Sequence, residues 1–454
     1  MPLLETTEKQ RLDLGHRRDL IMKAAVQEGL LQREGDLLAA FIDLDGVDEN
    51  IAHLLDSFPS DVRTLHAFAA KANCLVPVLS HLEDRGMGCE VASEGELAQA
   101  LEAGFPAEQI VFDSPAKTFR ELRQALSLGT TVNADNFQEL DRIKEILAES
   151  PSASPVGIRI NPQVGIGGIE AMSTAGGTSK FGISLEDEGN RERLVEAFRN
   201  NSWLNRVHAH VGSQGCPLSL IARGIAQIVD FADEVNQLLG RRQITGIDIG
   251  GGLPVDFDSD APVSDFEGYV AELRASVPRL FSGEYLIITE FGRTILAKYG
   301  FIAAFVEYTK TSGGRAIAIT HAGAQVATRT AMMPESWPIR IGTYDADGDP
   351  KTGPAVEQDV AGPCCFAGDL VARNRPLPLL QPGDIVSLLD TGAYYFSTHF
   401  SYNSLPAPAV YGVTIDSEDK VTFRVLRHAE TIPELLLRSG VNEAAEPTST
   451  QEPT

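Results

Sequence analysis

The chain has 454 residues, 43% of them hydrophobic, which is enough apolar material to build two folded domains. Its formal net charge is −25, with 63 acidic against 38 basic residues. So acidic a surface argues against nucleic acid or an anionic membrane as a partner. No apolar run reaches the roughly 18 residues of a membrane span, and the N-terminus lacks an export signal.

The five cysteines are scattered and include no CxxC pair. This pattern predicts neither a disulfide framework nor a metal site of the zinc type, and it indicates a reducing, cytoplasmic setting.

In chain order, the first predicted element is a helix over about 6–32, where apolar residues recur at helical spacing. A short strand over 37–42 and a helix near 47–55 follow. Strand-like runs then alternate with helical patterns. The eight runs cover 64–70, 88–92, 109–112, 130–133, 156–160, 206–211, 244–249 and 286–289. Their number predicts a (β/α)8 barrel, with a doubly wound open sheet as the alternative, because counting strands does not show closure.

After Gly300, helical patterns fade and strand-like runs separated by turn residues take over, so a second, mainly β domain is predicted for 301–430. In this division, 38–300 is the barrel and 1–37 is a helical segment that could pack on the β domain. The remaining residues, 431–454, are predicted to be a largely disordered tail.

Polar residues gather at the ends of the predicted barrel strands, and in a barrel they converge on the C-terminal face, where active sites lie. The set comprises Lys71, Glu90, Arg159, Asn161, His210, Ser213, Gly250, Gly251, Gly252, Glu290, Gly292 and Arg293. Three consecutive glycines let the backbone approach a phosphate group closely. A lysine, a carboxylate and a phosphate site together suggest pyridoxal 5′-phosphate, which bonds to a lysine amine and acts as an electron sink when its ring is protonated.

The sequence resembles the fold type III pyridoxal-phosphate decarboxylases, which include diaminopimelate and ornithine decarboxylases, from about residue 38 to residue 413. Nine segments carry the resemblance, and they occur in the same order as in the family. They are Phe-Ala-Ala-Lys-Ala-Asn (68–73), Ala-Ser-Glu-Gly-Glu-Leu (92–97), Ser-Lys-Phe-Gly (179–182), His-Val-Gly-Ser-Gln (210–214), Asp-Ile-Gly-Gly-Gly (248–252), Glu-Phe-Gly-Arg (290–293), Gly-Pro-Cys-Cys (362–365), Asp-Thr-Gly-Ala-Tyr (390–394) and Tyr-Asn (402–403).

The resemblance implies a barrel of the alanine racemase type in a homodimer with shared active sites. It implies that Lys71 holds the cofactor aldehyde, that His210 stacks on the pyridine ring and that Glu290 faces the ring nitrogen. Cys365 would return a proton to the substrate Cα from the partner subunit. The implied phosphate ligands are Ser213, Gly250, Gly251, Gly252, Gly292, Arg293 and Tyr394.

Several positions depart from the family pattern. Phe366 stands where the family usually has Asp or Glu to hold the distal amine of a diamino acid. Glu90 replaces an Asp, and Phe291 replaces a Pro. In the segment after Arg329 the family's Pro and Tyr are missing, and His321 stands near an acidic position. An apolar side chain facing a substrate ammonium would leave that charge unpaired.

These departures predict a decarboxylase with an altered substrate pocket, in which Arg329, Phe366 and Tyr394 contact the substrate. The first alternative is an amino-acid racemase, although racemases of this fold tend to place an arginine, not a carboxylate such as Glu290, at the pyridine nitrogen. The second alternative is a non-catalytic protein that binds pyridoxal phosphate.

Overall fold

The computed structural model describes residues 13–165, 175–261 and 265–441. The chain divides into two compact units. The barrel unit combines Asp43–Gly300 with Asp390–Ser397. The mainly β unit combines His16–Ile42, Phe301–Leu389 and the described residues from Thr398 onward. A short segment from late in the sequence therefore belongs to the barrel unit.

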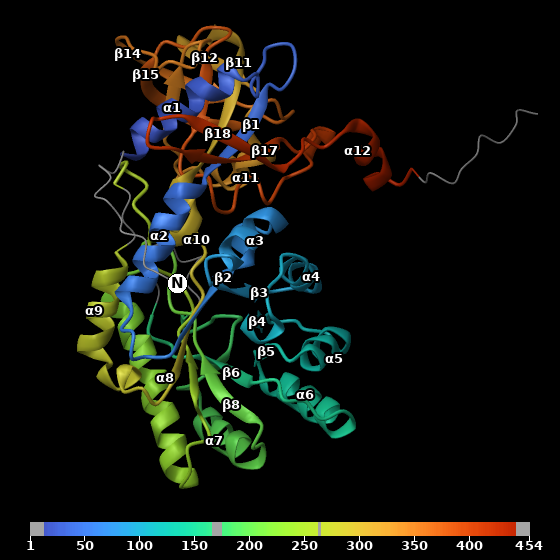
Figure 1. Cartoon of the computed structure of the whole chain (residues 1–454), viewed down its shortest axis with the longest axis vertical. Helices are drawn as coiled ribbons and strands as arrows, with labels where there is room; N and C mark the ends of the chain where they lie inside the picture. Colours follow the sequence, from blue (N-terminus) through green and yellow to red (C-terminus); the bar gives the residue numbers. More distant parts are fainter. Residues whose placement is uncertain (1–12, 166–174, 262–264, 442–454) are drawn as a thin grey trace, which may run out of the picture. The chain divides into compact units, whose positions relative to one another are not determined.

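Eight parallel strands form the wall of the barrel unit (Figure 1). They are β2 (Thr64–Ala69), β3 (Gly88–Val91), β4 (Ile110–Asp113), β5 (Thr131–Ala134), β6 (Val156–Asn161), β8 (Leu204–His208), β9 (Gly246–Asp248) and β10 (Leu286–Thr289). Their order is β5-β4-β3-β2-β10-β9-β8-β6, and β5 also pairs with β6. This last pairing closes the barrel. All eight predicted strands are confirmed, and the open sheet is excluded.

Helices connect successive strands of the barrel, and Figure 1 shows α3 to α6 on the outside of the strands that they join. The helices of this unit are α2 (Leu44–Ser57), α3 (Val76–Glu83), α4 (Glu94–Glu102), α5 (Phe119–Leu128), α6 (Phe137–Glu149), α7 (Asn190–Asn200), α8 (Leu218–Leu239), α9 (Phe266–Ser276) and α10 (Arg293–Leu296). Local sequence sets several of their starts. Thr118 and Glu121 form a capping box at α5, and Ser93 and Asn136 cap α4 and α6. A two-residue strand, β7 (Ile183–Ser184), pairs with β6.

The mainly β unit contains one mixed sheet in the order β15-β14-β12-β11-β1-β17-β18, with β16 pairing with both β11 and β13. The strands are β1 (Leu38–Asp43), β11 (Gly300–Ser312), β12 (Arg315–Thr320), β13 (Ile341–Tyr344), β14 (Ala355–Ala361), β15 (Leu370–Pro378), β16 (Ile385–Leu388), β17 (Ala409–Ile415) and β18 (Val421–Arg427). Its helices are α1 (Leu14–Gln27), α11 (Ala324–Met332) and α12 (Ile432–Arg438).

Two elements differ from the sequence-based expectation. β1 lies in the range assigned to the barrel, but it pairs between β11 and β17 in the other sheet. Its residues Ala39–Ile42 are buried on both faces, which suits an interior strand. Helix α12 lies in the predicted disordered tail, where Thr431 and Glu434 form a capping box and Leu435 is buried. Residues 442–454 of that tail lie outside the described residues.

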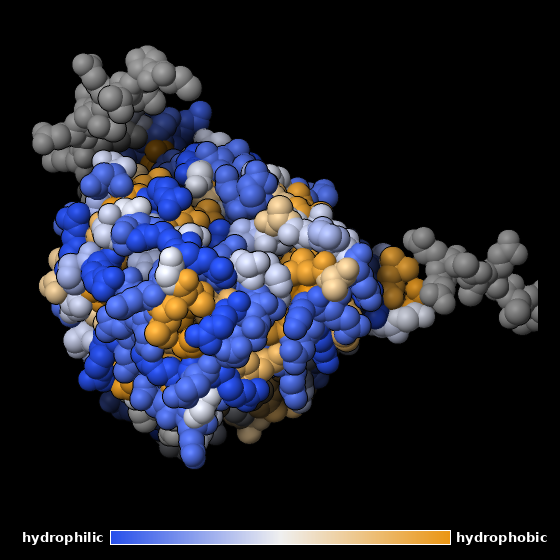
Figure 2. All heavy atoms as spheres, turned by 90° about the horizontal axis from the view of Figure 1, so that it is seen from below, coloured by the Kyte–Doolittle hydropathy of each residue, from blue (hydrophilic) through white to orange (hydrophobic). Residues whose placement is uncertain are grey.

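The face of the molecule in Figure 2 is mostly hydrophilic, with hydrophobic groups in separate clusters. Within the described part of the chain, no helix is both long enough and apolar enough to cross a bilayer.

Candidate active site

Lys71 lies where the sequence predicts a reactive lysine, in a short turn, Ala70–Ala72, directly after β2. Its Nζ atom donates to Oε2 of Glu90, on the neighbouring strand β3, at 2.6 Å. Burial by itself lowers the pKa of the Lys71 ammonium, but the charges of Glu90 and Glu290 outweigh this effect and raise the pKa. The Lys71 side chain is 40% exposed, so its amine is accessible, and Glu90 is placed to accept its proton.

Glu290 follows β10 at the same end of the barrel. Both of its carboxylate oxygens are buried without a hydrogen-bond partner among the described residues. Burial raises the pKa of Glu290, and the charge of Asp248 raises it further. A buried carboxylate needs a cation or a hydrogen-bond donor nearby to stay ionised. The site therefore fits a bound group that presents a protonated nitrogen to Glu290, as pyridoxal phosphate does.

His210 lies in the loop after β8, beside Glu290. Its Nδ1 atom is 3.6 Å from Glu290 Oε2 and accepts the N–H of Gly251 at 3.3 Å. Because Nδ1 is an acceptor, the ring proton belongs on Nε2. Burial lowers the pKa of His210, and the positive charge of Lys71 lowers it further, so the imidazole is neutral. A neutral, flat ring at this place fits the predicted stacking role.

The glycines after β9 and β10 are required by backbone conformation and close packing. Gly250 and Gly252 have φ angles of +64° and +92°, a region that side chains disfavour. A Cβ atom at Gly251 would lie 2.4 Å from the carbonyl oxygen of Glu290, and one at Gly292 would lie 2.9 Å from an alanine of the β2 loop. The Glu290 N–H also donates to the Gly250 carbonyl at 2.8 Å. The two loops are thus held together beside Lys71.

Tyr394 belongs to the barrel unit, which corrects its predicted place in the β domain. The segment Asp390–Ser397 packs on the barrel loops. The Tyr394 N–H donates to the Ala72 carbonyl at 2.7 Å, and Lys298 pairs with Asp390 at 3.2 Å. The Arg293 guanidinium is buried and lies 4.7 Å from the centre of the Tyr394 ring. Two of the predicted phosphate ligands are therefore adjacent to each other and to the loop that carries Lys71.

Arg159 and Ser213, the other predicted cofactor ligands, also lie at the C-terminal end of the barrel. Arg159 Nη1 donates to Asp113 Oδ2 at 3.0 Å, and its guanidinium is 4.4 Å from the centre of the Phe181 ring. These contacts pair Arg159 with Asp113 at the end of the barrel that carries the other cofactor candidates. Ser213 is half-buried in the loop after β8, where its carbonyl accepts the Cys216 N–H at 3.1 Å.

The sequence did not single out three buried ionisable residues beneath this site. His208 lies with its Nε2 atom 3.1 Å from Asp113 Oδ2 and its Nδ1 atom 3.2 Å from Asp248 Oδ1. Asn133 donates to the other oxygen of Asp248 at 3.1 Å. One signal was available, because His208 precedes His210 by two positions, and residues two apart in extended backbone point to the same side.

Cys365, the predicted acid, lies in the mainly β unit with an exposed side chain. Its N–H donates to Asn403 Oδ1 at 2.7 Å. The adjacent Cys364 is buried, its N–H donates to Asp369 Oδ2 at 2.6 Å, and it packs in an apolar cluster. This difference in exposure distinguishes the two thiols, since only the exposed one is accessible to a substrate.

The predicted substrate residues Phe366 and Arg329 are also in the mainly β unit. The Phe366 ring contacts Tyr402 edge to face, with 5.5 Å between ring centroids, and packs against the cluster around Cys364. The Arg329 guanidinium lies 4.6 Å from the centre of the Trp337 indole. The surroundings of Phe366 are aromatic, so a carboxylate at this position would have little to pair with in its own unit.

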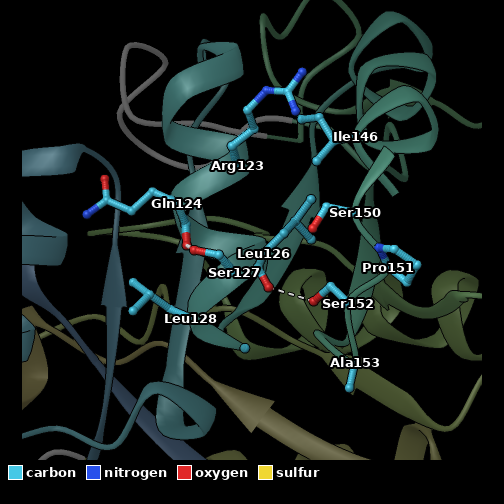
Figure 3. Close-up of a pocket in the computed structure, with 11 residues that line it drawn as sticks. Arg123, Gln124, Leu126, Ser127, Leu128, Ile146, Ser150, Pro151, Ser152 and Ala153 are labelled. Carbon is cyan, nitrogen blue, oxygen red and sulfur yellow. Dashed lines mark hydrogen bonds between the residues drawn. The ribbon is translucent and has the colours of Figure 1, made fainter. Parts of the chain in front are cut away.

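A pocket of about 800 Å³ lies at the other end of the barrel (Figure 3). It is lined by the last turns of α5 and α6 and by the segments that lead into β5 and β6. Its polar contacts include a bond of 2.5 Å from Ser152 Oγ to the Leu126 carbonyl. None of the candidate residues lines it, so the chemistry of the site does not involve this pocket.

The closed barrel and the lysine, carboxylate and glycine-rich loops at its C-terminal end define a class of enzyme that binds pyridoxal 5′-phosphate. The family model for the pyridoxal binding domain of the pyridoxal-dependent decarboxylases matches residues 44–297. The chain belongs to this family, and its cofactor is pyridoxal 5′-phosphate. It is thus a pyridoxal-phosphate-dependent carboxy-lyase.

The chain is similar over most of its length to diaminopimelate decarboxylases. It is 30% identical to that enzyme from Methanothermobacter thermautotrophicus, over 87% of this chain and 92% of the relative. It is also 30% identical to the Pseudomonas aeruginosa enzyme, over 82% and 85% of the two chains. Among solved structures, diaminopimelate decarboxylase from Helicobacter pylori complexed with L-lysine matches with a TM-score of 0.78 and 26% identity, covering 91% of this chain and 100% of that one.

Proposed function

We propose that this enzyme removes the α-carboxylate of an amino acid related to diaminopimelate, with a distal group other than a plain ammonium. The observation that carries the proposal is the buried carboxylate of Glu290, which lies beside Lys71 and His210 and has no hydrogen-bond partner in the described part of the chain. When bound, pyridoxal phosphate supplies an electron sink for the charge left on the substrate Cα. A carboxylate at the ring nitrogen strengthens that sink, whereas a racemase is served better by a weaker one.

Each residue of the site has a proposed role. Lys71 gives its proton to Glu90 and binds the cofactor aldehyde, and His210 covers one face of the ring. Glu290 holds the ring nitrogen in its protonated form. Cys365 would donate the proton that replaces carbon dioxide, because a thiol can act as a general acid.

The remaining proposed ligands act on the phosphate group. Arg293 supplies positive charge, and the loop from Gly250 to Gly252 lets the backbone approach the phosphate closely, because no side chain separates it from a ligand. Ser213, Gly292 and Tyr394 complete this group. Arg159 acts through Asp113, to which it donates.

The substrate proposal rests on Phe366 and on the likeness to diaminopimelate decarboxylases. An apolar side chain at the position that holds a distal amine in the family would leave an ammonium unpaired, which is costly in a closed site. A distal group that is acylated, carboxylated or aromatic suits an aromatic neighbour better.

We further propose a cytoplasmic homodimer in which Cys365 of one subunit serves the barrel of the other. All five cysteines are free, which agrees with a reducing compartment. The exposed thiol of Cys365 is available to a second subunit.

The test is carbon dioxide release from a panel of L- and D-amino acids, including N-acylated and carboxylated diamines, with chiral analysis of the remaining substrate. The wild type should release carbon dioxide from at least one of them. Lys71→Ala should lose this activity, whereas Lys144→Ala, which changes an exposed lysine on α6, should keep it. Inversion of the substrate without carbon dioxide release would show a racemase and overturn the proposal.

A further inference from the structure

A polar column fills part of the barrel interior below the active site. Barrel interiors are usually filled by branched apolar side chains. Here Arg206, His208 and His210 alternate along β8 and its extension, so they share the inward face at three successive depths. Arg206, the deepest of them, donates to Thr131 Oγ1 at 2.6 Å. His208, in the middle, has an exposed fraction of 0%.

His208 lies between two carboxylates, Asp113 on one side and Asp248 on the other, at 3.1 and 3.2 Å. These two contacts are close enough for ion pairs. Neither ring nitrogen of His208 makes a hydrogen bond of good geometry to another described residue. A ring nitrogen without a proton would repel a carboxylate oxygen at this distance, so both nitrogens carry one. Burial lowers the pKa of His208, but Asp248 and Asp113 outweigh it and raise the pKa well above its usual range. The ring is an imidazolium.

This imidazolium lies close to Glu290. One side-chain atom each of Asp113, His208 and Glu290 lies within 4.8 Å of the other two. Burial and the charges of Asp248, Glu90 and Asp113 raise the pKa of Glu290 well above its usual range, and the charge of His208 opposes this rise. Without His208, the pKa of Glu290 would rise further, because like charges in a buried site disfavour the ionised form.

We propose that His208 is a positioning residue whose imidazolium, fixed by Asp113 and Asp248, favours the ionised form of Glu290, so that Glu290 can hold the protonated ring nitrogen of the cofactor. The proposal rests on the proposed role of Glu290 in the decarboxylase. The titratable groups that face this cluster from the neighbouring strands and loops are Lys71, Glu90, Arg159, Arg206 and His210. Lys71 and Arg159 already pair with Glu90 and Asp113, and Arg206 interacts with Asp248, which leaves His208 as the cation that bridges toward Glu290.

The experiment compares holoenzymes of the wild type, His208→Gln and His66→Gln. His66 is a matched control, because it is also a buried strand histidine, but its Nδ1 atom contacts Thr289 Oγ1 at 2.9 Å, and burial lowers its pKa to about 4, so it is neutral. The readouts are the pH profile of kcat and KM and the ¹⁵N NMR signal of ring-labelled cofactor, which reports protonation of its nitrogen independently of turnover.

For His208→Gln we expect kcat near neutral pH to fall about tenfold with KM nearly unchanged, because a carboxyl group whose pKa lies above the working pH loses about tenfold of its ionised fraction for each further pKa unit. The acid limb of the profile should move to higher pH, and the ¹⁵N signal should move toward the unprotonated form. His66→Gln should change neither readout. In a Glu290→Gln background, adding His208→Gln should produce no further shift.

An unchanged acid limb and ¹⁵N signal in His208→Gln would overturn the proposal, even if the variant were less stable. If that variant does not fold, the wild type decides the question. The ¹⁵N signals of its His208 ring at pH 8 should be those of an imidazolium, and a neutral ring would overturn the proposal. Failure of the proposed function would give a different result. No amino acid in the panel would release carbon dioxide, while His208→Gln would still change the protonation of the cofactor's ring nitrogen.

Discussion

The pair of Lys71 and Glu90 shows how a single residue becomes reactive in this barrel. The amine is held as an ammonium by a buried carboxylate at 2.6 Å, while part of its side chain remains exposed. Lysine needs to lose a proton before it can act as a nucleophile, and Glu90, whose pKa burial raises, is the nearest acceptor. Reactivity therefore depends on the neighbouring strand as much as on Lys71 itself.

The first residue-scale prediction concerns the covalent attachment point. The purified protein should be yellow, and borohydride reduction followed by peptide mapping should place the pyridoxyl group on Lys71. Its accessible amine beside Glu90 is the physical reason. Lys117, which is buried and pairs with Glu139 at 2.9 Å, should stay unlabelled. A pyridoxyl group on Lys117 or Lys180 would contradict the assignment.

The second residue-scale prediction concerns specificity. The wild type should turn over diaminopimelate, ornithine and lysine poorly, and Phe366→Glu should improve kcat/KM for lysine and diaminopimelate through a charge-assisted contact of about 1.5–3 kcal/mol. Phe366→Gln is the matched control, because it removes the same ring without adding a charge. An equal gain in both variants would mean that space, and not charge, limits these substrates.

Efficient turnover of either diamino acid by the wild type would show that another residue holds the distal amine. Asp369 is already committed, because it is buried and accepts the backbone N–H groups of Ala324 and Cys364, each at 2.6 Å. Glu335, which is exposed, would then be the next candidate.

At the scale of elements, the loops after β9 and β10 position most of the site. Any side chain at Gly251 would collide with the Glu290 carbonyl, so the close packing of the two loops requires a glycine at this position. A bulkier residue in one loop displaces the carboxylate of the other. The order of the strands matters for the same reason, since β9 and β10 are neighbours in the barrel.

We expect Gly251→Ala to lower the free energy of unfolding by about 1–3 kcal/mol, as overpacking does, and to weaken cofactor binding. Urea unfolding and a fluorescence titration of the apoprotein with pyridoxal phosphate measure the two effects. Gly95→Ala is the control. It lies at the start of α4, where a Cβ atom would approach only Ser93 Oγ, at 3.7 Å, and it should leave cofactor binding unchanged. Unchanged binding in Gly251→Ala would show that this loop does not contribute to the cofactor site.

At the scale of the whole molecule, the net charge of −25 and the mostly hydrophilic face in Figure 2 suit a protein whose partners are small molecules and not polyanions. The barrel unit contains the proposed cofactor ligands, including Tyr394, whereas Cys365 lies in the other unit. The proposal of a shared site in the dimer therefore depends on Cys365.

Subunit exchange tests this proposal. Lys71→Ala mixed with Cys365→Ala should recover about a quarter of the wild-type activity, because random exchange makes half of the dimers hybrid, each with one intact site of two. Lys71→Ala mixed with His210→Ala is the control and should recover none, because every barrel then carries one defect. No recovery in the first mixture, with exchange shown independently, would mean that each site is built within one chain.

Local sequence determined much of this protein. The periodicity of apolar residues predicted all eight barrel strands, because each strand is short, buried and followed by its own helix. The cofactor was predicted from the types of residue at the strand ends, above all Lys71, Glu290 and the three glycines. Pyridoxal phosphate needs an amine for its aldehyde, a carboxylate for its ring nitrogen and a backbone that can approach its phosphate. The identity of the residue at 366 led to the prediction of a changed substrate, which the substrate panel and Phe366→Glu test.

Only the tertiary structure decided the remaining points, because they depend on contacts between residues far apart in the chain. Closure required the pairing of β5 with β6, and β1 joined the other sheet through backbone bonds that no local pattern encodes. Tyr394 is held in the barrel unit by a hydrogen bond from its backbone N–H to the Ala72 carbonyl. The pKa of His208 is raised because Asp113 and Asp248 approach it from strands β4 and β9, and burial makes an ionisable residue depend on such partners.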